Sequence, residues 1–312
     1  MSLNQSSQSR PFRTVTDYYQ AKFGMKVIKI ALNGGFTCPN RDGTLSTKGC
    51  LYCSEMGSGE FAGKPLDPLD VQFAKGKALM SIKWPNGKYI AYFQANTNTY
   101  GPVEKLRSLF ESALVLDPNI VGLAIATRPD CLNDEILDLL TELNQKTYLS
   151  IELGLQTIHY ETATLINRGH TLQQFELAVK QLRSRGIEVV VHIINGLPKE
   201  TPAMMMETIQ YLNRQDIQGI KIHMLYLLKN TEIAKLYRDH PFHLLTKEEY
   251  VFIVVDQIEH LRSDIIIHRL TGDAPRNQLL APKWTLQKIV VNNEIDQELR
   301  RRQSNQGKRW QL

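Results

Sequence analysis

Three of the four cysteines lie in one stretch of the chain, at Cys38, Cys50 and Cys53, with the spacing C-x11-C-x2-C. Thiolates are good ligands for zinc, copper(I) and iron–sulfur clusters. The two-residue gap lets two thiolates reach one metal centre from a single turn, and the third arrives from the same loop. Three cysteines would leave one iron of a four-iron cluster without a protein ligand, and a substrate or cofactor can bind at that position. The spacing therefore favours an open iron–sulfur site.

Two other interpretations of this cysteine stretch remain open. A structural zinc site normally has four protein ligands. No histidine precedes His159, so in the first half of the chain only Cys131 or a carboxylate such as Glu55 could complete a zinc site. The other alternative is that the three thiols are inert and lie together by chance.

Seven short apolar runs, rich in β-branched residues, are spaced along the chain. They cover residues 26–32, 88–94, 120–127, 147–155, 187–196, 219–228 and 265–270. Most do not alternate between apolar and polar positions, which is typical of strands covered on both faces. Helix start signals lie between them, as capping boxes at Thr171 with Gln174 and at Thr246 with Glu249, and as a proline directly after Thr201. Strands and helices therefore alternate.

This alternation predicts βαβ units with right-handed crossovers and a parallel sheet. Six or seven such units predict an α/β fold in the form of a partial or complete (β/α) barrel rather than a doubly wound sheet. The segment 33–38 after the first strand has no G-x-G-x-x-G pattern and enters no helix, so a dinucleotide-binding turn is not indicated. Because the working groups of a barrel follow the carboxyl ends of its strands, the cysteine stretch is expected at that edge.

The composition is that of a folded protein without a membrane span. Of the 312 residues 42% are apolar, which excludes intrinsic disorder. Every apolar run is shorter than the roughly 18 residues that a membrane span needs. The Ser/Gln-rich first ten residues lack the apolar core of a secretory signal or an anchor. We therefore expect a cytoplasmic protein, in which cysteines are more often metal-binding or catalytic than disulfide-bonded.

The formal net charge of +5 is concentrated at the carboxyl end. Residues 283–312 contain seven Lys or Arg against three acidic residues, including the run Arg300, Arg301 and Arg302. Such a tail could neutralise the phosphates of a nucleic acid, or it could be the solvated face of a terminal helix.

Several longer motifs carry a resemblance to a known family. They are T-C-P-N-R-D-G-T, G-C-L-Y-C-S, A-T-R-P-D-C-L, E-L-G-L-Q-T, I-N-R-G-H-T, H-I-I-N-G-L-P-K-E-T and T-G-D-A-P-R-N-Q-L-L-A-P-K-W. With them the chain resembles the radical S-adenosylmethionine (SAM) superfamily from about Lys26 to Trp284, and in particular its YhcC/YtqA-like family. The elongator tRNA-modifying catalytic subunit is a more distant relative. Most of the superfamily has C-x3-C-x2-C, whereas the eleven-residue gap found here matches these two closer groups.

The resemblance implies a radical SAM enzyme with a [4Fe-4S] cluster and SAM as cofactors. Such an enzyme cleaves SAM reductively to methionine and a 5′-deoxyadenosyl radical, with electrons from a flavodoxin or ferredoxin type of donor. It also implies an N-terminal segment (1–22), a radical SAM barrel (23–270) and a short C-terminal extension with the basic tail (271–312). RNA or tRNA is the substrate class that the relatives indicate, whereas acetyl transfer does not carry over because the chain is too short for an acetyltransferase domain. The alternative function is a zinc-bearing nucleic-acid-binding protein without catalysis.

By the same resemblance, specific residues should hold the cofactors. The cluster ligands would be Cys38, Cys50 and Cys53. The SAM contacts would be Gln94, Ala95, Asn96, Thr97, Glu152, Gln156, Arg168, His192 and Leu225. The alternative for residues 94–97 is an ordinary polar turn. The alternative for Glu152 and Arg168 is a structural Glu–Arg pair, because an unpaired carboxylate inside an apolar strand would be costly to bury.

Four residues keep more than one interpretation. His192 would contact the ribose or be a satisfied core histidine, and Leu225 with Tyr226 would cover the adenine or belong to the hydrophobic core. Cys131, expected at the end of the third strand, would donate a hydrogen atom, bind another ligand or be a small buried apolar residue.

Overall fold

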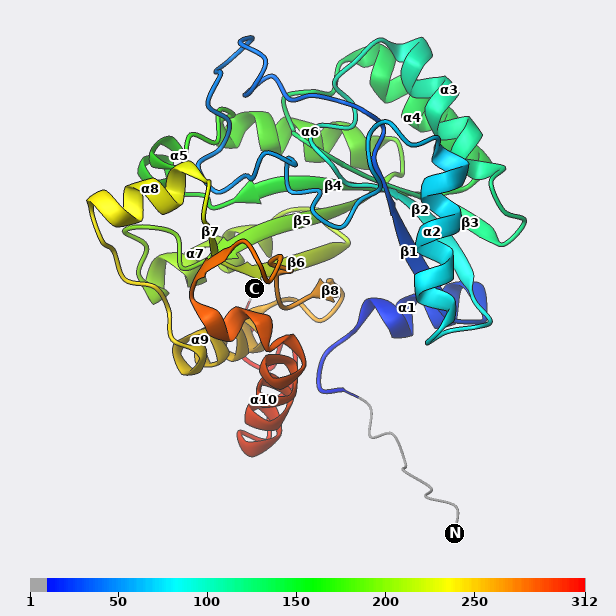
Figure 1. The fold of residues 1–312 in the computed structure, drawn as a ribbon. Helices are drawn as coiled ribbons and strands as arrows, with labels where there is room; N and C mark the ends of the chain where they lie inside the picture. The colour runs from blue at the N-terminus through cyan, green and yellow to red at the C-terminus, as the bar shows by residue number, and fades with distance from the viewer. Residues whose placement is uncertain (1–9, 312) are drawn as a thin grey trace.

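A computed structural model describes residues 10–311, and its centre is a sheet of seven parallel strands in the order β1-β2-β3-β4-β5-β6-β8. The strands are Val27–Leu32 (β1), Lys88–Phe93 (β2), Ile120–Thr127 (β3), Tyr148–Gln156 (β4), Glu188–Asn195 (β5), Gly219–Met224 (β6) and Ile266–Arg269 (β8). They curl into a half-barrel (Figure 1) whose two edges are β1 and β8. The predicted α/β barrel is therefore confirmed in its partial form.

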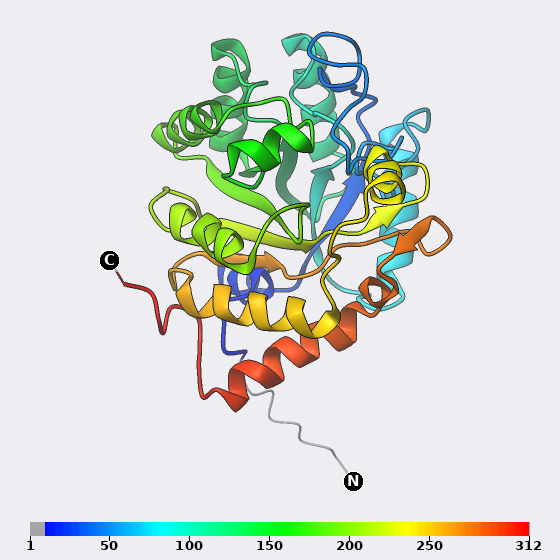
Figure 2. The ribbon, with the colours of Figure 1, turned by 90° about the vertical axis from the view of Figure 1, so that its left-hand side faces the viewer.

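The helices lie around the outside of the curled sheet (Figure 2). They are Val15–Phe23 (α1), Leu69–Ser81 (α2), Val103–Leu114 (α3), Asp134–Lys146 (α4), Tyr160–Leu165 (α5), Leu172–Ser184 (α6), Pro202–Leu212 (α7), Glu232–Asp239 (α8), Lys247–His260 (α9) and Lys288–Arg301 (α10). Both predicted capping boxes form, at Thr171 and Thr246, and α7 begins at Pro202 as expected. Among residues 10–311, no helix is long and apolar enough to cross a membrane.

The two faces of the sheet differ in chemistry because successive side chains of a strand point to opposite sides. Toward the helices the strands present apolar residues such as Phe93, which meets Phe110 of α3 edge to face at 5.0 Å. Full burial of one such side chain stabilises the fold by about 2 kcal/mol. Toward the inside of the half-barrel they present charged residues, including Lys29 and Glu152. The strands are thus covered by helices on one side and line the lumen of the half-barrel on the other, with charged residues and with apolar ones such as Val27 and Ile90.

Helix α1 lies at the open side of the half-barrel, in contact with both edge strands. Arg13 accepts a backbone hydrogen bond from Ile267 of β8 at 2.9 Å, and Tyr19 is buried against Val27 and Ile90. The N-terminal segment predicted over residues 1–22 therefore includes a helix that packs onto the barrel. Its Ser/Gln-rich start falls largely outside the described residues, and the boundaries predicted at 22 and 270 stay predictions.

The carboxyl part of the chain adds two features. Strands β7 (Leu227–Leu228) and β9 (Leu279–Ala281) form a small antiparallel pair, and a 3-10 helix follows at Lys283–Leu286. Helices α9 and α10 pack along one another (Figure 2).

Candidate active site

The cysteine stretch lies in the long connection between β1 and α2, after the carboxyl end of β1, as predicted. Leu51, inside the stretch, is held from two sides by its backbone. Its N–H donates to the carbonyl of Ile166 at 2.9 Å, and its carbonyl accepts from the N–H of Ile233 at 2.9 Å. These bonds join the cysteine stretch to the end of α5 and the start of α8, so three distant segments are fixed at one edge of the sheet.

Polar side chains hold two of the cysteine sulfurs. Asn40 donates from Nδ2 to Sγ of Cys50 at 3.4 Å, and the Ser58 hydroxyl lies 3.4 Å from Sγ of Cys53. The thiol of Cys53 also donates to Cys50, which together with the positive charge of Arg128 lowers the pKa of Cys50 to about 6. The same bond raises the pKa of Cys53 well above its ordinary value. Cys50 is therefore the sulfur that this environment prepares as a thiolate.

The donor set fits an open cluster better than a zinc ion. Within residues 10–311, no three His, Cys, Asp or Glu side chains, Cys38, Cys50 and Cys53 included, are grouped closely enough to hold one metal ion. Zinc draws its sulfur ligands to about 2.3 Å from a single centre, whereas each thiolate of a cluster binds a different iron and the sulfurs stand further apart. Three cysteines without a fourth ligand match the second case.

Arg128, at the end of β3, is a site residue that the sequence reasoning did not select. Its guanidinium donates two bonds to the Asp130 carboxylate, at 2.9 and 2.8 Å, and one to the Arg168 carbonyl at 2.8 Å. Burial opposes its charge, but Asp130 and the Cys50 and Cys38 sulfurs outweigh burial and raise its pKa. The motif A-T-R-P-D-C-L contained the signal, because an arginine two residues before an acid at a strand end is poised to form such a fork.

Arg168 does not pair with Glu152, so the predicted alternative of a Glu–Arg pair is wrong. The buried Arg168 guanidinium instead donates to the backbone carbonyls of Leu155, Thr157 and His170, at distances of 2.6 to 3.1 Å. Its planar fork is used to close the turn between β4 and α6. The sequence could not reveal this, because every residue has a backbone carbonyl and the residue types do not indicate which carbonyls accept a hydrogen bond.

Glu152 is instead the centre of a cluster inside the half-barrel. Its carboxylate accepts hydrogen bonds from Nζ of Lys29 (2.7 Å), Oη of Tyr92 (2.7 Å), Nε2 of His192 (2.8 Å) and Nζ of Lys221. We call these five residues the lumen cluster. They come from β1, β2, β4, β5 and β6, and the two lysines hold the pKa of the Glu152 carboxyl well below its ordinary value despite its burial.

The turn 94–97 after β2 packs against the cysteine connection. Gln94 donates to the Ser58 carbonyl at 2.9 Å, and Asn96 donates to the Phe36 carbonyl at 3.0 Å. Asn96 has a φ of 59°, and a Cβ added to Gly57 would lie 2.0 Å from its Oδ1, so position 57 requires glycine. Ala95 and Thr97 of the same turn are buried.

The remaining predicted SAM contacts lie near the same edge. Gln156 ends β4 in a bulge with a φ of 61°, and its amide lies over Gly154. Leu225 is buried with Ile166 and Leu197, which agrees with the core interpretation, while the Tyr226 hydroxyl donates to the Asp273 carbonyl at 3.1 Å.

Cys131 follows β3 at the same edge. Burial and the Asp130 carboxylate raise the pKa of its thiol to about 12. It is therefore a protonated thiol near the cysteine stretch, and its role stays a prediction.

The arginines of the basic tail are engaged by acids. Arg301 forms a fork with Glu298 at 2.7 Å, and Arg300 bonds Asp296 at 2.9 Å. Arg302 reaches across to α9 to bind Asp256 and the buried Glu259. Much of the charge that suggested a nucleic-acid contact thus joins α10 to α9 or lies in local pairs.

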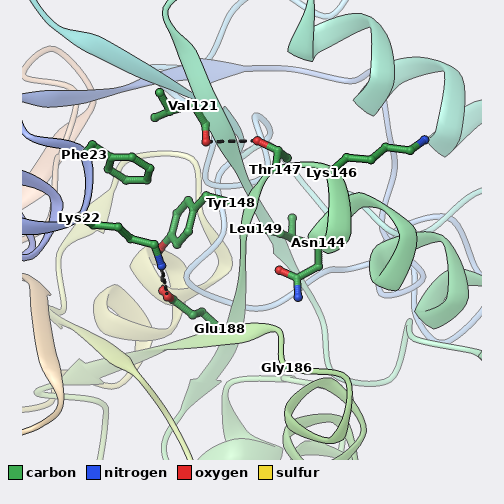
Figure 3. Close-up of a pocket in the computed structure, with 10 residues that line it drawn as sticks. All are labelled: Lys22, Phe23, Val121, Asn144, Lys146, Thr147, Tyr148, Leu149, Gly186 and Glu188. Carbon is green, nitrogen blue, oxygen red and sulfur yellow. Dashed lines mark hydrogen bonds and ion pairs between the residues drawn. The ribbon is translucent and has the colours of Figure 1, made fainter.

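A shallow pocket of about 580 Å³ opens at the amino ends of β3, β4 and β5, away from the cysteine stretch. Figure 3 shows Lys22 of α1 and Glu188 pointing toward one another across it, at 2.9 Å, beside Tyr148. Because the cysteines follow the opposite ends of the strands, this pocket is not part of the candidate site.

The comparisons with known proteins agree with this geometry. Residues 37–212 match the Radical SAM superfamily, and residues 217–301 match the Radical SAM C-terminal domain. The chain belongs to the radical SAM superfamily, and it is an enzyme of this class, which in general uses a [4Fe-4S] cluster and SAM.

Its similarity to two bacterial relatives extends over most of the chain. It is 50% identical to the uncharacterized protein YtqA of Bacillus subtilis over 98% of this chain and 95% of YtqA, and 36% identical to protein YhcC of Escherichia coli over 89% of each. A tRNA uridine(34) acetyltransferase of Methanocaldococcus jannaschii is 26% identical over 49% of this chain and 28% of that protein. The solved structure of Elp3 from Methanocaldococcus infernus has a TM-score of 0.66 at 16% identity, over 90% of this chain and 64% of that one, and therefore shares the fold. The predicted resemblance is confirmed.

Proposed function

We propose that Cys38, Cys50 and Cys53 hold a [4Fe-4S] cluster at which the enzyme cleaves SAM reductively. The observation that carries this proposal is that the three thiols lie in one connection at the carboxyl edge of the half-barrel, where Arg128 and polar side chains surround the Cys50 and Cys53 sulfurs. When bound, the two cofactors supply methionine and a 5′-deoxyadenosyl radical.

The residues around the sulfurs hold and balance them. Asn40 and Ser58 orient the sulfurs of Cys50 and Cys53 through hydrogen bonds. Arg128 supplies a buried positive charge next to the thiolates, which offsets part of the cost of burying them. Its bond to the Arg168 carbonyl joins this charge to the turn after β4, so the sulfur environment and the rim of the lumen form one rigid unit.

We extend the proposal to the SAM contacts. Backbone carbonyls of the turn 94–97 would accept hydrogen bonds from the SAM amine, and Gln156 and Arg168 would face its methionyl end. The positive φ of Asn96 and of Gln156 supports this, because such strained positions gather where backbone is built around a ligand. Glu152 and His192 would contact SAM from the lumen cluster, where Glu152 already accepts four hydrogen bonds. Leu225 would cover the adenine.

RNA is the substrate class that we propose, on the similarity to a tRNA uridine(34) acetyltransferase. The engaged arginines of α10 support only a small contribution of the basic tail. We also propose an acidic flavodoxin or ferredoxin type of electron donor and a cytoplasmic location.

Anaerobic reconstitution with iron and sulfide, followed by reductant and SAM, tests the central proposal. We expect about four irons per chain and formation of 5′-deoxyadenosine by the parent protein. Cys50→Ala should lose the iron and the product, whereas Cys131→Ser, the matched control outside the cysteine stretch, should keep the iron. Equal iron and product in the parent and Cys50→Ala would refute the assignment. Zinc instead of iron in the purified protein would favour the alternative function, which the comparisons do not support.

A further inference from the structure

The lumen cluster carries more positive than negative groups. Glu152 is shared by two cations, Lys29 and Lys221. Asp273, which follows β8, likewise forms ion pairs with two cations, with Arg269 at 2.5 Å and with Lys288. Two carboxylates thus face four basic side chains, of which Lys29 and Lys221 are the more buried and Arg269 and Lys288 are 39% and 48% exposed. Burying an unbalanced charge is costly, so such a site is stabilised by an added anion.

The protonation of Lys221 reflects this imbalance. Burial, together with repulsion from Lys29 and Arg269, lowers the pKa of its ammonium group to about 7 although Glu152 favours the charged form. Without an anion the cluster therefore tends to shed a proton. An anion bound beside Lys221 would raise this pKa again.

The hydrogen-bond donors Lys29 and His192 of the cluster, and not its acid, are partly exposed. The side chain of Glu152 is 0% exposed, whereas those of Lys29 and His192 are 18% and 22% exposed. A group that enters the half-barrel therefore meets donors first. The carboxylate lies behind them, where it orients the donors without repelling an anion at close range.

Donors remain available for a ligand at this place. Lys221 uses two of its three N–H bonds, on Glu152 and on the Tyr92 hydroxyl at 3.2 Å. His223, two residues further along β6, has a buried Nε2 with no partner among the described residues, and its ring lies 5.4 Å from that of His192. An unsatisfied buried nitrogen is unusual and points to a missing partner.

We propose that Lys29, Lys221 and His223 bind a compact anionic group of the substrate, a carboxylate or a phosphate, inside the half-barrel. The inference deepens the proposed function and rests on it, since the lumen opens toward the edge that carries the cysteine stretch. It adds that the part of the substrate bound inside the half-barrel is an anionic group. Glu152 is then a positioning residue that holds both lysines and His192 in place.

The test uses the reconstituted full chain with 15N-labelled histidine rings, without SAM or reductant. Sodium phosphate and sodium acetate are titrated separately, with sodium chloride at equal ionic strength as the reference. We expect the ring signals of His192 and His223 to shift saturably with phosphate or acetate and not with chloride. The tighter of the two identifies the phosphate or the carboxylate as the natural group.

Two variants test the location. Lys221→Met and Lys29→Met each keep the unbranched apolar stem of the side chain and remove its charge, and each should weaken binding at least tenfold. Lys308→Met, on the exposed tail, should bind as the parent does. Unchanged ring signals in the parent, or equal binding by the parent and by a folded lumen variant, would overturn the inference. Because no SAM cleavage is needed, this result is independent of the test for 5′-deoxyadenosine, and the two proposals can fail separately.

Discussion

Asn40 and Cys50 are joined by a hydrogen bond from the amide Nδ2 to the sulfur, at 3.4 Å, and the same nitrogen donates to the Asn167 carbonyl at 2.6 Å. The residue is buried, and its backbone carbonyl accepts from Gly49. One amide therefore fixes a proposed cluster ligand relative to the turn that carries Arg168.

Asn40→Ala should lower the reduction potential of the reconstituted cluster by roughly 50 mV, which is about 1.2 kcal/mol for one electron. The reason is that a hydrogen bond to a cluster sulfur stabilises the more negative, reduced state. A redox titration followed by electron paramagnetic resonance measures the shift. Asn293→Ala, on the exposed face of α10, is the control. An unchanged potential in an Asn40→Ala protein with full iron content would contradict this role.

Glu152→Ala should lower the free energy of unfolding by about 3–5 kcal/mol at pH 7, because two buried lysines and a histidine lose their shared acceptor. Urea denaturation measures the change. Glu111→Ala removes an exposed acid that pairs with Lys146 and should cost less than about 1 kcal/mol. A loss for Glu152→Ala as small as that of the control would mean that solvent reaches the lumen cluster freely.

Acid should destabilise the protein through its buried histidines. Burial and the charges of Arg168 and Arg128 lower the pKa of His170 to about 3, and burial with Lys221 lowers that of His192 to about 4. Unfolded histidines titrate near pH 6.5, so below that pH the unfolded chain binds more protons than the folded one. Their contribution is complete above pH 6.5 and falls by about 1.4 kcal/mol per pH unit for each histidine as the pH drops toward 4.

Urea titrations at pH 7.5, 6.0 and 5.0 measure this loss of stability. His170→Gln should reduce the slope by about one proton, because Gln cannot take up the charge. His240→Gln, at an exposed position, should leave the slope as it is. The explanation fails if the slopes of the parent and His170→Gln coincide.

Arg302→Ala should destabilise the protein by about 2 kcal/mol, because the buried Glu259 loses a charged hydrogen bond. Arg301→Ala should change stability by less than about 0.5 kcal/mol, since the Arg301 side chain is 69% exposed against 17% for Arg302. Thermal or urea unfolding of the two variants measures the difference. Equal effects would mean that α10 is not held to α9 by this ion pair.

Local patterns were sufficient for the architecture. The apolar runs without alternation predicted parallel strands covered on both faces, of which the inner one carries the charged lumen cluster instead. The capping boxes at Thr171 and Thr246 marked helix starts correctly. These features depend on neighbours a few residues apart. The sequence did not decide between a partial and a complete barrel. Pairing between the edge strands β1 and β8 depends on the curvature of the sheet and on α1 rather than on any local signal.

The sequence pointed to candidate site residues that are adjacent in the chain and not to those that are distant along it. The spacing of Cys38, Cys50 and Cys53 predicts a metal centre. Asn40 and Arg128 were overlooked, because their importance depends on hydrogen bonds to the Cys50 sulfur and the Arg168 carbonyl. The pairing of Glu152 with Arg168, the alternative to a SAM contact, does not form, and Glu152 pairs with lysines of other strands instead.

The sequence by itself determined the three-cysteine stretch, the order of strands and helices, and the family resemblance, since each is written in residue types at short spacing. Only the tertiary structure decided that Lys29 and Lys221 meet on Glu152, because 123 and 69 residues separate them from it along the chain. A charged residue in an apolar strand signals that it needs a partner. Which partner it finds depends on the curling of the sheet, which brings β1, β4 and β6 around one lumen.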